Sequence, residues 1–155
     1  PEPLEASAAP VTALTERFTC PEPTETPASA SEFETALKKA APGDVIYLEA
    51  GKYIGNFDLK AKGTAEKPIF LCGAEGSVLQ GPSRKTGYVL HLDGAEHWRL
   101  SGFAVRHGLK GILLDDARTN ALQDLQVTDI GDEGVHLRTE QRQRPAGTAD
   151  SPDRG

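Results

Sequence analysis

The stretch APGDVIYLEAGKY, residues 41–53, contains the pattern on which the fold prediction depends. Its apolar run at 45–48 recurs along the chain as pairs of aliphatic residues two positions apart. The successive pairs are Ile46 and Leu48, Ile69 and Leu71, Leu90 and Leu92, Ile112 and Leu114, and Val135 and Leu137, at steps of 23, 21, 22 and 23 residues. A repeat of this length is typical of a solenoid.

A second column of aliphatic residues lies between these pairs, at Leu79, Leu100 and Leu122. Leucine-rich repeats would need a dense Leu-x-x-Leu-x-Leu frame, which the sequence lacks. Short strands with inward aliphatic residues and Gly, Asn or Asp turns instead favour an all-β fold. We therefore predict a right-handed parallel β-helix of four to five coils, whose inner faces become a core only when the coils stack.

One helix is expected before the first strand, over residues 31–41. Ser31 and Glu34 have the spacing of a capping box, and Phe33, Ala36, Leu37 and Ala40 recur at helical spacing. An open solenoid end exposes strand edges and core side chains. The helix is therefore predicted to be a lid with Phe33 and Leu37 facing the core; a helix packed beside the solenoid is the alternative.

The chain divides into three parts. Residues 1–30 are rich in Pro, Thr and Glu and are expected to be flexible, whereas residues 31–139 form the β-helix domain. Residues 140–155 contain no aliphatic residue larger than alanine, so they cannot form another coil. Two explanations stay open for them: a natural flexible tail, or a disordered tail left by truncation or a frameshift.

Composition and charge exclude several functions. Residues 1–50 carry nine acidic and three basic residues, which account for the whole net charge of -6. The neutral remainder lacks the basic face of a nucleic-acid-binding protein, and no apolar run is long enough to cross a membrane. We expect a monomer. Cys20 and Cys72 are predicted to form a disulfide, with a buried pair of thiols as the alternative.

Several stretches resemble a known family. Residues 41–53 and GTAEKPI (63–69) resemble the opening coil of pectin-lyase-like right-handed β-helix proteins. HWRLSGF (97–103) resembles the next coil, and GDEGVHLR (131–138) resembles a later one. The family includes secreted polysaccharide lyases that act on alginate, chondroitin and pectate. The resemblance implies an extracellular, carbohydrate-related role with calcium, but it assigns no catalytic residue, because in those lyases the catalytic groups lie on middle coils.

Outward residues of successive coils give the first candidate site. At the 22-residue spacing, Asp93, Asp115 and Arg138 share one column, and His91 and His136 share another. Carboxylates beside an arginine and a histidine could hold a cation and a sugar acid. The alternative is an exposed ion pair between Asp115 and Arg138, which would contribute little.

Three further features have both a functional and a structural interpretation. Asp132 and Glu133, with Asp129 and His136 nearby, could bind Ca²⁺ or simply form a hydrophilic turn. Trp98 could stack on a sugar or be half-buried at a turn. Asn120 is expected to adopt the left-handed conformation of a turn.

The sequence thus predicts a secreted β-helix protein related to polysaccharide lyases. It would bind acidic polysaccharide, or cleave it by β-elimination if the full parent is active. Asp115, His136, Arg138 and Trp98 are the candidate substrate-binding residues. A noncatalytic carbohydrate-binding module and an inactive fragment are the alternatives.

Overall fold

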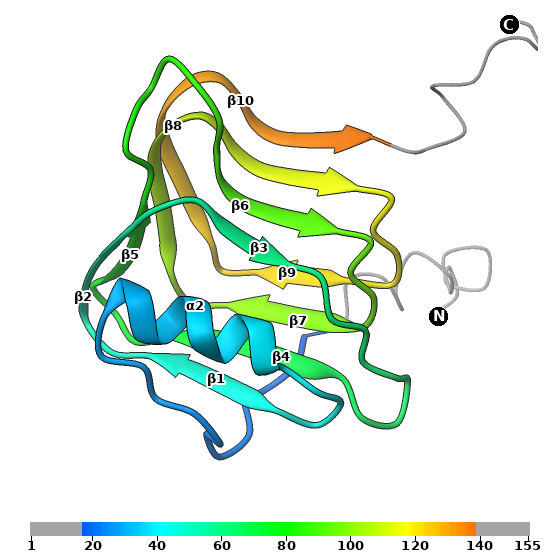
Figure 1. Cartoon of the computed structure of the whole chain (residues 1–155). Helices are drawn as coiled ribbons and strands as arrows, with labels where there is room; N and C mark the ends of the chain where they lie inside the picture. Colours follow the sequence, from blue (N-terminus) through cyan, green and yellow to red (C-terminus); the bar gives the residue numbers. More distant parts are fainter. Residues whose placement is uncertain (1–16, 139–155) are drawn as a thin grey trace, which may run out of the picture.

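The computed structural model describes residues 17–138, which form a parallel β-solenoid of about four turns with one short helix before the coils (Figure 1). One face of the solenoid is a four-stranded sheet in the order β1-β4-β7-β9. Its strands are β1 (Val45–Leu48), β4 (Ile69–Gly73), β7 (Trp98–Ser101) and β9 (Ala121–Gln123).

The other strands form a sheet in the order β2-β5-β8-β6-β3, and β10 pairs with β8. They are β2 (Gly51–Ile54), β3 (Phe57–Leu59), β5 (Ser77–Gln80), β6 (Tyr88–Asp93), β8 (Ala104–Asp115) and β10 (Gln126–Arg138). The first part of β8 pairs with β5 and its last part pairs with β6. This sheet therefore covers two faces of the solenoid, which the long strands β8 and β10 join.

Inward aliphatic side chains stack in columns, as the repeat predicts. Leu90, Ile112 and Val135 are paired in register, and so are Leu92, Leu114 and Leu137. The predicted alignment of the first two coils was wrong: Ile46 pairs with Leu71, and Leu90 pairs with Phe57. Leu79 likewise pairs with Tyr53 and Val105, in a different sheet from Leu100 and Leu122.

Two long connections explain this error. Residues 60–68 join β3 to β4, and residues 81–87 join β5 to β6. Consequently 33 residues separate Phe57 from its partner Leu90, whereas Leu90 and Ile112 are 22 residues apart. Only the later coils have the uniform spacing that the sequence pattern assumes.

The helix α2 (Ala30–Lys39) lies across the end of the solenoid at the first coil (Figure 1). Phe33, Ala36 and Leu37 are buried, and the Phe33 ring lies 4.7 Å from that of Phe57, which confirms the predicted lid. The helix begins at Ala30, one residue earlier than expected, because Ser29, not Ser31, is its N-cap. The Ser29 hydroxyl accepts a hydrogen bond from the Glu32 amide, satisfying a free N–H of the first turn.

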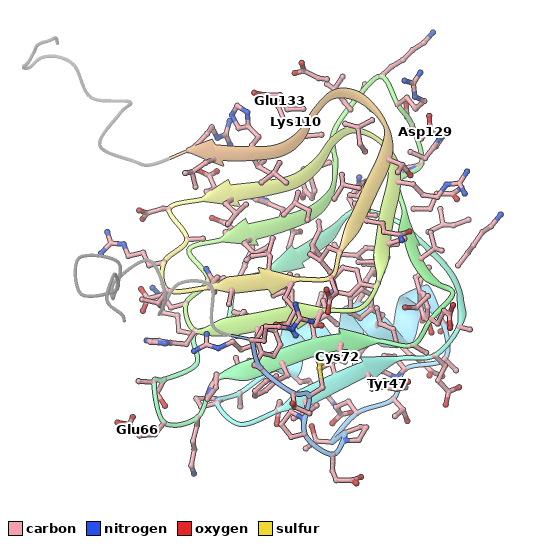
Figure 2. The ribbon with its side chains drawn as sticks, turned by 180° about the vertical axis from the view of Figure 1, so that it is seen from behind. Tyr47, Glu66, Cys72, Lys110, Asp129 and Glu133 are labelled. Atoms are coloured by element: carbon pink, nitrogen blue, oxygen red, sulfur yellow. A yellow bond between two sulfur atoms is a disulfide. The ribbon has the colours of Figure 1, made fainter. Side chains whose placement is uncertain are left out.

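The segment before the helix crosses the outer side of the four-stranded sheet. The Gln123 side-chain amide accepts a hydrogen bond from the Phe18 backbone N–H and donates one to the Phe18 carbonyl. The Tyr47 backbone N–H donates to the Glu25 carbonyl. Between these contacts, Cys20 forms the predicted disulfide with Cys72 of β4 (Figure 2). Residues 17–25 therefore link the first, second and fourth coils.

The apolar core is concentrated in the first three coils. Its largest buried side chains lie between Phe33 and Leu100, whereas no residue of β9 or β10 is buried, and Val135 and Leu137 are 54% and 56% exposed. The predicted tail, 140–155, lies outside the described residues, as does 1–16 of the expected flexible segment. Among the described helices, none is long and apolar enough to cross a membrane.

Candidate functional site

The candidate site is the outward side of β3, β6 and the last parts of β8 and β10, which we call the polar face. The register of the paired strands decides which outward side chains are neighbours. It aligns polar side chains in three rows: Asp58, His91 and His136; Asp93, Asp115 and Arg138; and Tyr88, Lys110 and Glu133. Leu113 separates His91 from His136 in the first row.

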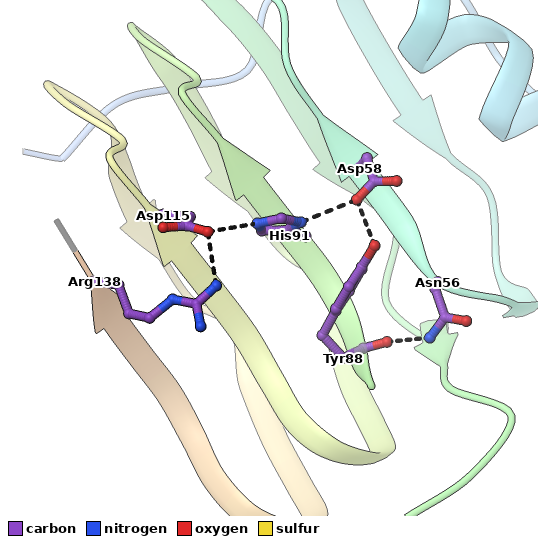
Figure 3. A network of polar contacts seen from close by, with 6 residues as sticks. All are labelled: Asn56, Asp58, Tyr88, His91, Asp115 and Arg138. Carbon is purple, nitrogen blue, oxygen red and sulfur yellow. Dashed lines mark hydrogen bonds and ion pairs between the residues drawn. The ribbon is translucent and has the colours of Figure 1, made fainter. Parts of the chain in front are cut away.

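A chain of polar contacts crosses these strands (Figure 3). The Tyr88 hydroxyl donates to Asp58 Oδ1 at 2.6 Å, and His91 Nδ1 lies 3.1 Å from the same oxygen. On the other side of the ring, His91 Nε2 lies 3.5 Å from Asp115 Oδ2, which accepts a 2.7 Å hydrogen bond from Arg138. The predicted grouping of Asp93, Asp115 and Arg138 in one column is therefore confirmed.

Burial and neighbouring charges determine which side chains in this network of contacts are ionised. Partial burial, together with the hydrogen bond to Asp58, raises the pKa of Tyr88 to about 12, so its hydroxyl remains a donor at neutral pH. The hydrogen bond from Arg138 lowers the pKa of Asp115, which is ionised at neutral pH. The His91 side chain is only 14% exposed, and its buried Nε2 has no hydrogen-bond partner among the described residues.

Lys110 occupies the centre of the acidic cluster proposed for calcium. Its ammonium lies 3.0 Å from Glu133, beside which Figure 2 shows it. It also lies 2.7 Å from Asp132, and His136 contacts Glu133 as well. The hydrogen bond from Lys110 is the main reason that the pKa of Glu133 is lowered. Asp132 and Glu133 thus already have a cation between them, and they fit Ca²⁺ poorly.

Asp129, the remaining acidic residue of that cluster, belongs to a different contact. Its carboxylate lies 2.8 Å from Arg84 and 3.0 Å from His107 Nδ1. His107 and Asp129 occupy equivalent positions in successive coils, and both have a positive φ. They therefore form a corner of the solenoid, and the four sequence neighbours do not converge on one site.

A different group has the geometry to hold a metal ion. One ligand atom from each of His91, Asp93 and Asp115 lies within 4.8 Å of the others. Ca²⁺ prefers six to eight oxygen ligands, whereas an imidazole nitrogen suits transition metals better. With one nitrogen and two carboxylates, one of them already bonded to Arg138, this group does not match the calcium expected from the resemblance.

Two sequence interpretations are corrected by burial and backbone conformation. Trp98 is 0% exposed and its indole N–H donates to the Ala61 carbonyl, so neither ring face is available to a sugar. Asn120 does not take the left-handed conformation, which its neighbour Thr119 adopts instead. Its side chain bridges two coils, accepting from the Trp98 amide and donating to the Ala95 carbonyl.

Sequence reasoning missed Asp58, the ionic role of Lys110, and the place of Tyr88 in the network. Asp58 lies before two long connections, so no fixed spacing relates it to His91. The pair formed by Lys110 and Glu133 was detectable, because the two residues are 23 positions apart, close to the repeat length.

The fold and the polar face together define a parallel β-solenoid with an ionisable outward surface. No protein-family model matches the chain, and a search of curated proteins found no match. Among solved structures, the chain is similar to the crystal structure of alginate lyase from Paenibacillus sp. str. FPU-7, with a TM-score of 0.68 and 41% sequence identity. The match covers 72% of this chain and 39% of the alginate lyase. The chain is thus related to a polysaccharide lyase and spans less than half of its length.

Proposed function

We propose that this chain is part of a secreted lyase for acidic polysaccharide and that its polar face binds the polyuronate chain. The observation that carries the proposal is the 41% identity to an alginate lyase. The disulfide between Cys20 and Cys72 supports secretion, because such bonds persist in oxidising compartments.

β-Elimination beside a uronate requires a positive group that stabilises the carboxylate while the neighbouring C5 proton is removed. In our proposal Arg138 supplies this charge. One nitrogen of its guanidinium bonds Asp115 and fixes the side chain, and the group has five N–H donors in all. Among residues 17–138 the remaining donors have no partner, so in this proposal they bind a sugar carboxylate from the solvent side.

His136 and Asp115 have supporting roles in the proposal. The His136 side chain lies on the same strand as Arg138, two positions earlier, and is 25% exposed, so it can contact a bound sugar. Asp115 orients Arg138. The proposed roles do not involve calcium, since neither candidate group of ligands fits that ion.

Affinity for alginate oligomers tests the proposal. Wild-type chain should bind them in isothermal titration calorimetry, and Arg138→Ala should weaken binding about tenfold, the loss expected for one charge-assisted hydrogen bond. Lys52→Ala is the matched control, because Lys52 is an exposed cation on β2, away from the polar face. Equal affinities for wild type and Arg138→Ala would contradict the assignment.

Ultraviolet absorbance separates cleavage from binding. Elimination creates a carbon–carbon double bond conjugated to the carboxylate, so a lyase produces absorbing oligomers. Retention of alginate without absorbing product would mean that the chain is a binding module. Absence of both would overturn the proposed function.

A further inference from the structure

A cavity of about 610 Å³ lies between the helix α2 and the strand β3. Lys38 and Glu34 line it from the helix, and Asn56, Asp58 and Lys60 line it from the strand and its ends. The helix therefore not only covers the core but also forms one wall of a recess at the first coil.

This cavity is continuous with the polar face. Asp58 belongs to both, and Figure 3 shows Asp58 and Asn56 between the helix and the contacts of Tyr88 and His91. The strand β3 is at the edge of its sheet, so the polar face ends there. A polysaccharide that crosses the strands from Arg138 toward the first coil would reach the cavity and meet the helix.

Two of the four charged side chains that line the cavity, Lys38 and Lys60, can bind a carboxylate, whereas Glu34 and Asp58 are acidic. Within residues 17–138, neither Lys38 nor Lys60 has a carboxylate within ion-pair distance. Asp58, in contrast, is already bonded to Tyr88 and His91. Two ammonium groups are thus available to an incoming anion, to which each can donate several hydrogen bonds.

Neutral groups beside the lysines suit sugar hydroxyls. The Asn56 side-chain nitrogen donates to the Tyr88 carbonyl, which leaves the amide oxygen to accept a hydrogen bond. The Glu34 carboxylate is a further acceptor. A mixture of cations and acceptors matches a uronate, which carries one carboxylate and several hydroxyls.

We propose that the cavity between α2 and β3 is an end subsite for a uronate, whose carboxylate is bound by Lys38 and Lys60. This inference rests on the proposed function, since it assumes that a polyuronate occupies the polar face. It assigns the helix a role in substrate binding and places one end of the bound chain at the first coil.

Calorimetry with alginate oligomers of increasing length tests the subsite. The double variant Lys38→Ala/Lys60→Ala should bind long oligomers about tenfold more weakly than wild type. Lys38→Arg/Lys60→Arg should recover most of the affinity, because the charge is retained. Lys39→Ala/Lys62→Ala is the control: Lys39 lines a different recess, and Lys62 pairs with Glu96.

Oligomers whose carboxyl groups have been reduced to alcohols give an independent readout. They should bind wild type and the double alanine variant equally, because they carry no carboxylate. If wild type binds alginate oligomers and the double variant binds them equally well, the subsite is wrong and the proposed function stands. If wild type binds no alginate oligomer, the proposed function fails and the subsite fails with it.

Discussion

The Tyr88 hydroxyl shows how one side chain on the polar face is controlled by its neighbour. It donates to Asp58 at 2.6 Å, and removing its proton would place a phenolate against a carboxylate. Burial and this contact together raise its pKa to about 12. At neutral pH the hydroxyl therefore fixes Asp58, and it is a poor candidate for a base that removes the C5 proton.

Replacing Asp58 should make Tyr88 easier to deprotonate. In Asp58→Asn the negative neighbour is absent, so the pKa of Tyr88 should fall from about 12 toward the ordinary value of 10.0. Ultraviolet titration of tyrosinate measures it, and Tyr88→Phe identifies which of the three tyrosines is responsible. Because the pKa is raised in the folded state, the stability from the protonated hydroxyl is lost as pH rises from about 10 through 12. An unchanged titration in Asp58→Asn would mean that burial alone causes the shift.

Asn120 illustrates a polar residue that holds coils together. Its amide satisfies a backbone N–H at Trp98 and a carbonyl at Ala95. Asn120→Ala leaves both groups without that partner, and we expect the free energy of unfolding to fall by about 2 kcal/mol. Urea denaturation measures it. The control Asn56→Ala removes one exposed hydrogen bond and should cost less than half as much; equal losses would contradict the bridging role.

At the scale of elements, the segment 17–25 acts on several strands at once. It contacts β9 through Phe18, β4 through Cys20 and β1 through Glu25. The disulfide fixes the middle of this segment and closes a loop with a sequence separation of 52 residues. A loop of that length restricts the unfolded chain strongly.

Removing the disulfide should therefore lower stability more than any surface substitution. Loop entropy predicts a loss of roughly 4 kcal/mol for Cys20→Ser or Cys72→Ser. Thermal unfolding followed by circular dichroism measures it. Adding a reductant to the wild type should give the same melting temperature as either variant, and should leave the variants unchanged. A wild type insensitive to reductant would indicate that the segment's other contacts suffice.

The same scale shows what could be predicted from the sequence. Periodicity predicted the strands, the inward columns of the later coils and the lid, because burial imposes a strict pattern on each of them. It did not give the register of β1 and β3, since the insertions at 60–68 and 81–87 change the spacing without changing the local pattern. For that reason Arg138 and Asp115 were predicted together, while Asp58 was not.

Across the whole molecule, the forces that join successive coils change from one end to the other. The first coils are joined by buried side chains such as Leu48, Leu71 and Leu92. The last described coil has no fully buried residue: Leu122, Leu125 and Val127 pack against the core but are only partly buried. Backbone pairing and ion pairs therefore have a larger share in joining this coil to the third. The ion pairs are Lys110 with Asp132 and Glu133, and Arg138 with Asp115; His107 also contacts Asp129.

Acid should therefore release β10 before the rest of the solenoid. A side-chain hydrogen bond from Arg138, His107 or Lys110 is the main cause of a lowered pKa, at Asp115, Asp129 and Glu133 respectively. Stability from a lowered carboxyl pKa is complete above the ordinary values of about 4 and is lost as pH falls through the lowered ones. Hydrogen exchange at about pH 7 and about pH 3, corrected for the intrinsic rates, measures the opening of β10 relative to β4.

A substitution should reproduce the effect of acid at neutral pH. Lys110→Met removes the cation that joins β8 to Asp132 and Glu133. We expect faster exchange of the β10 amides in this variant and unchanged exchange in β4, whose neighbours are apolar. Lys52→Met, on the exposed side of β2, is the matched control. If β10 and β4 exchange together under acid and in Lys110→Met, the coils open as one unit, and buried contacts rather than ion pairs determine the stability of the last coil.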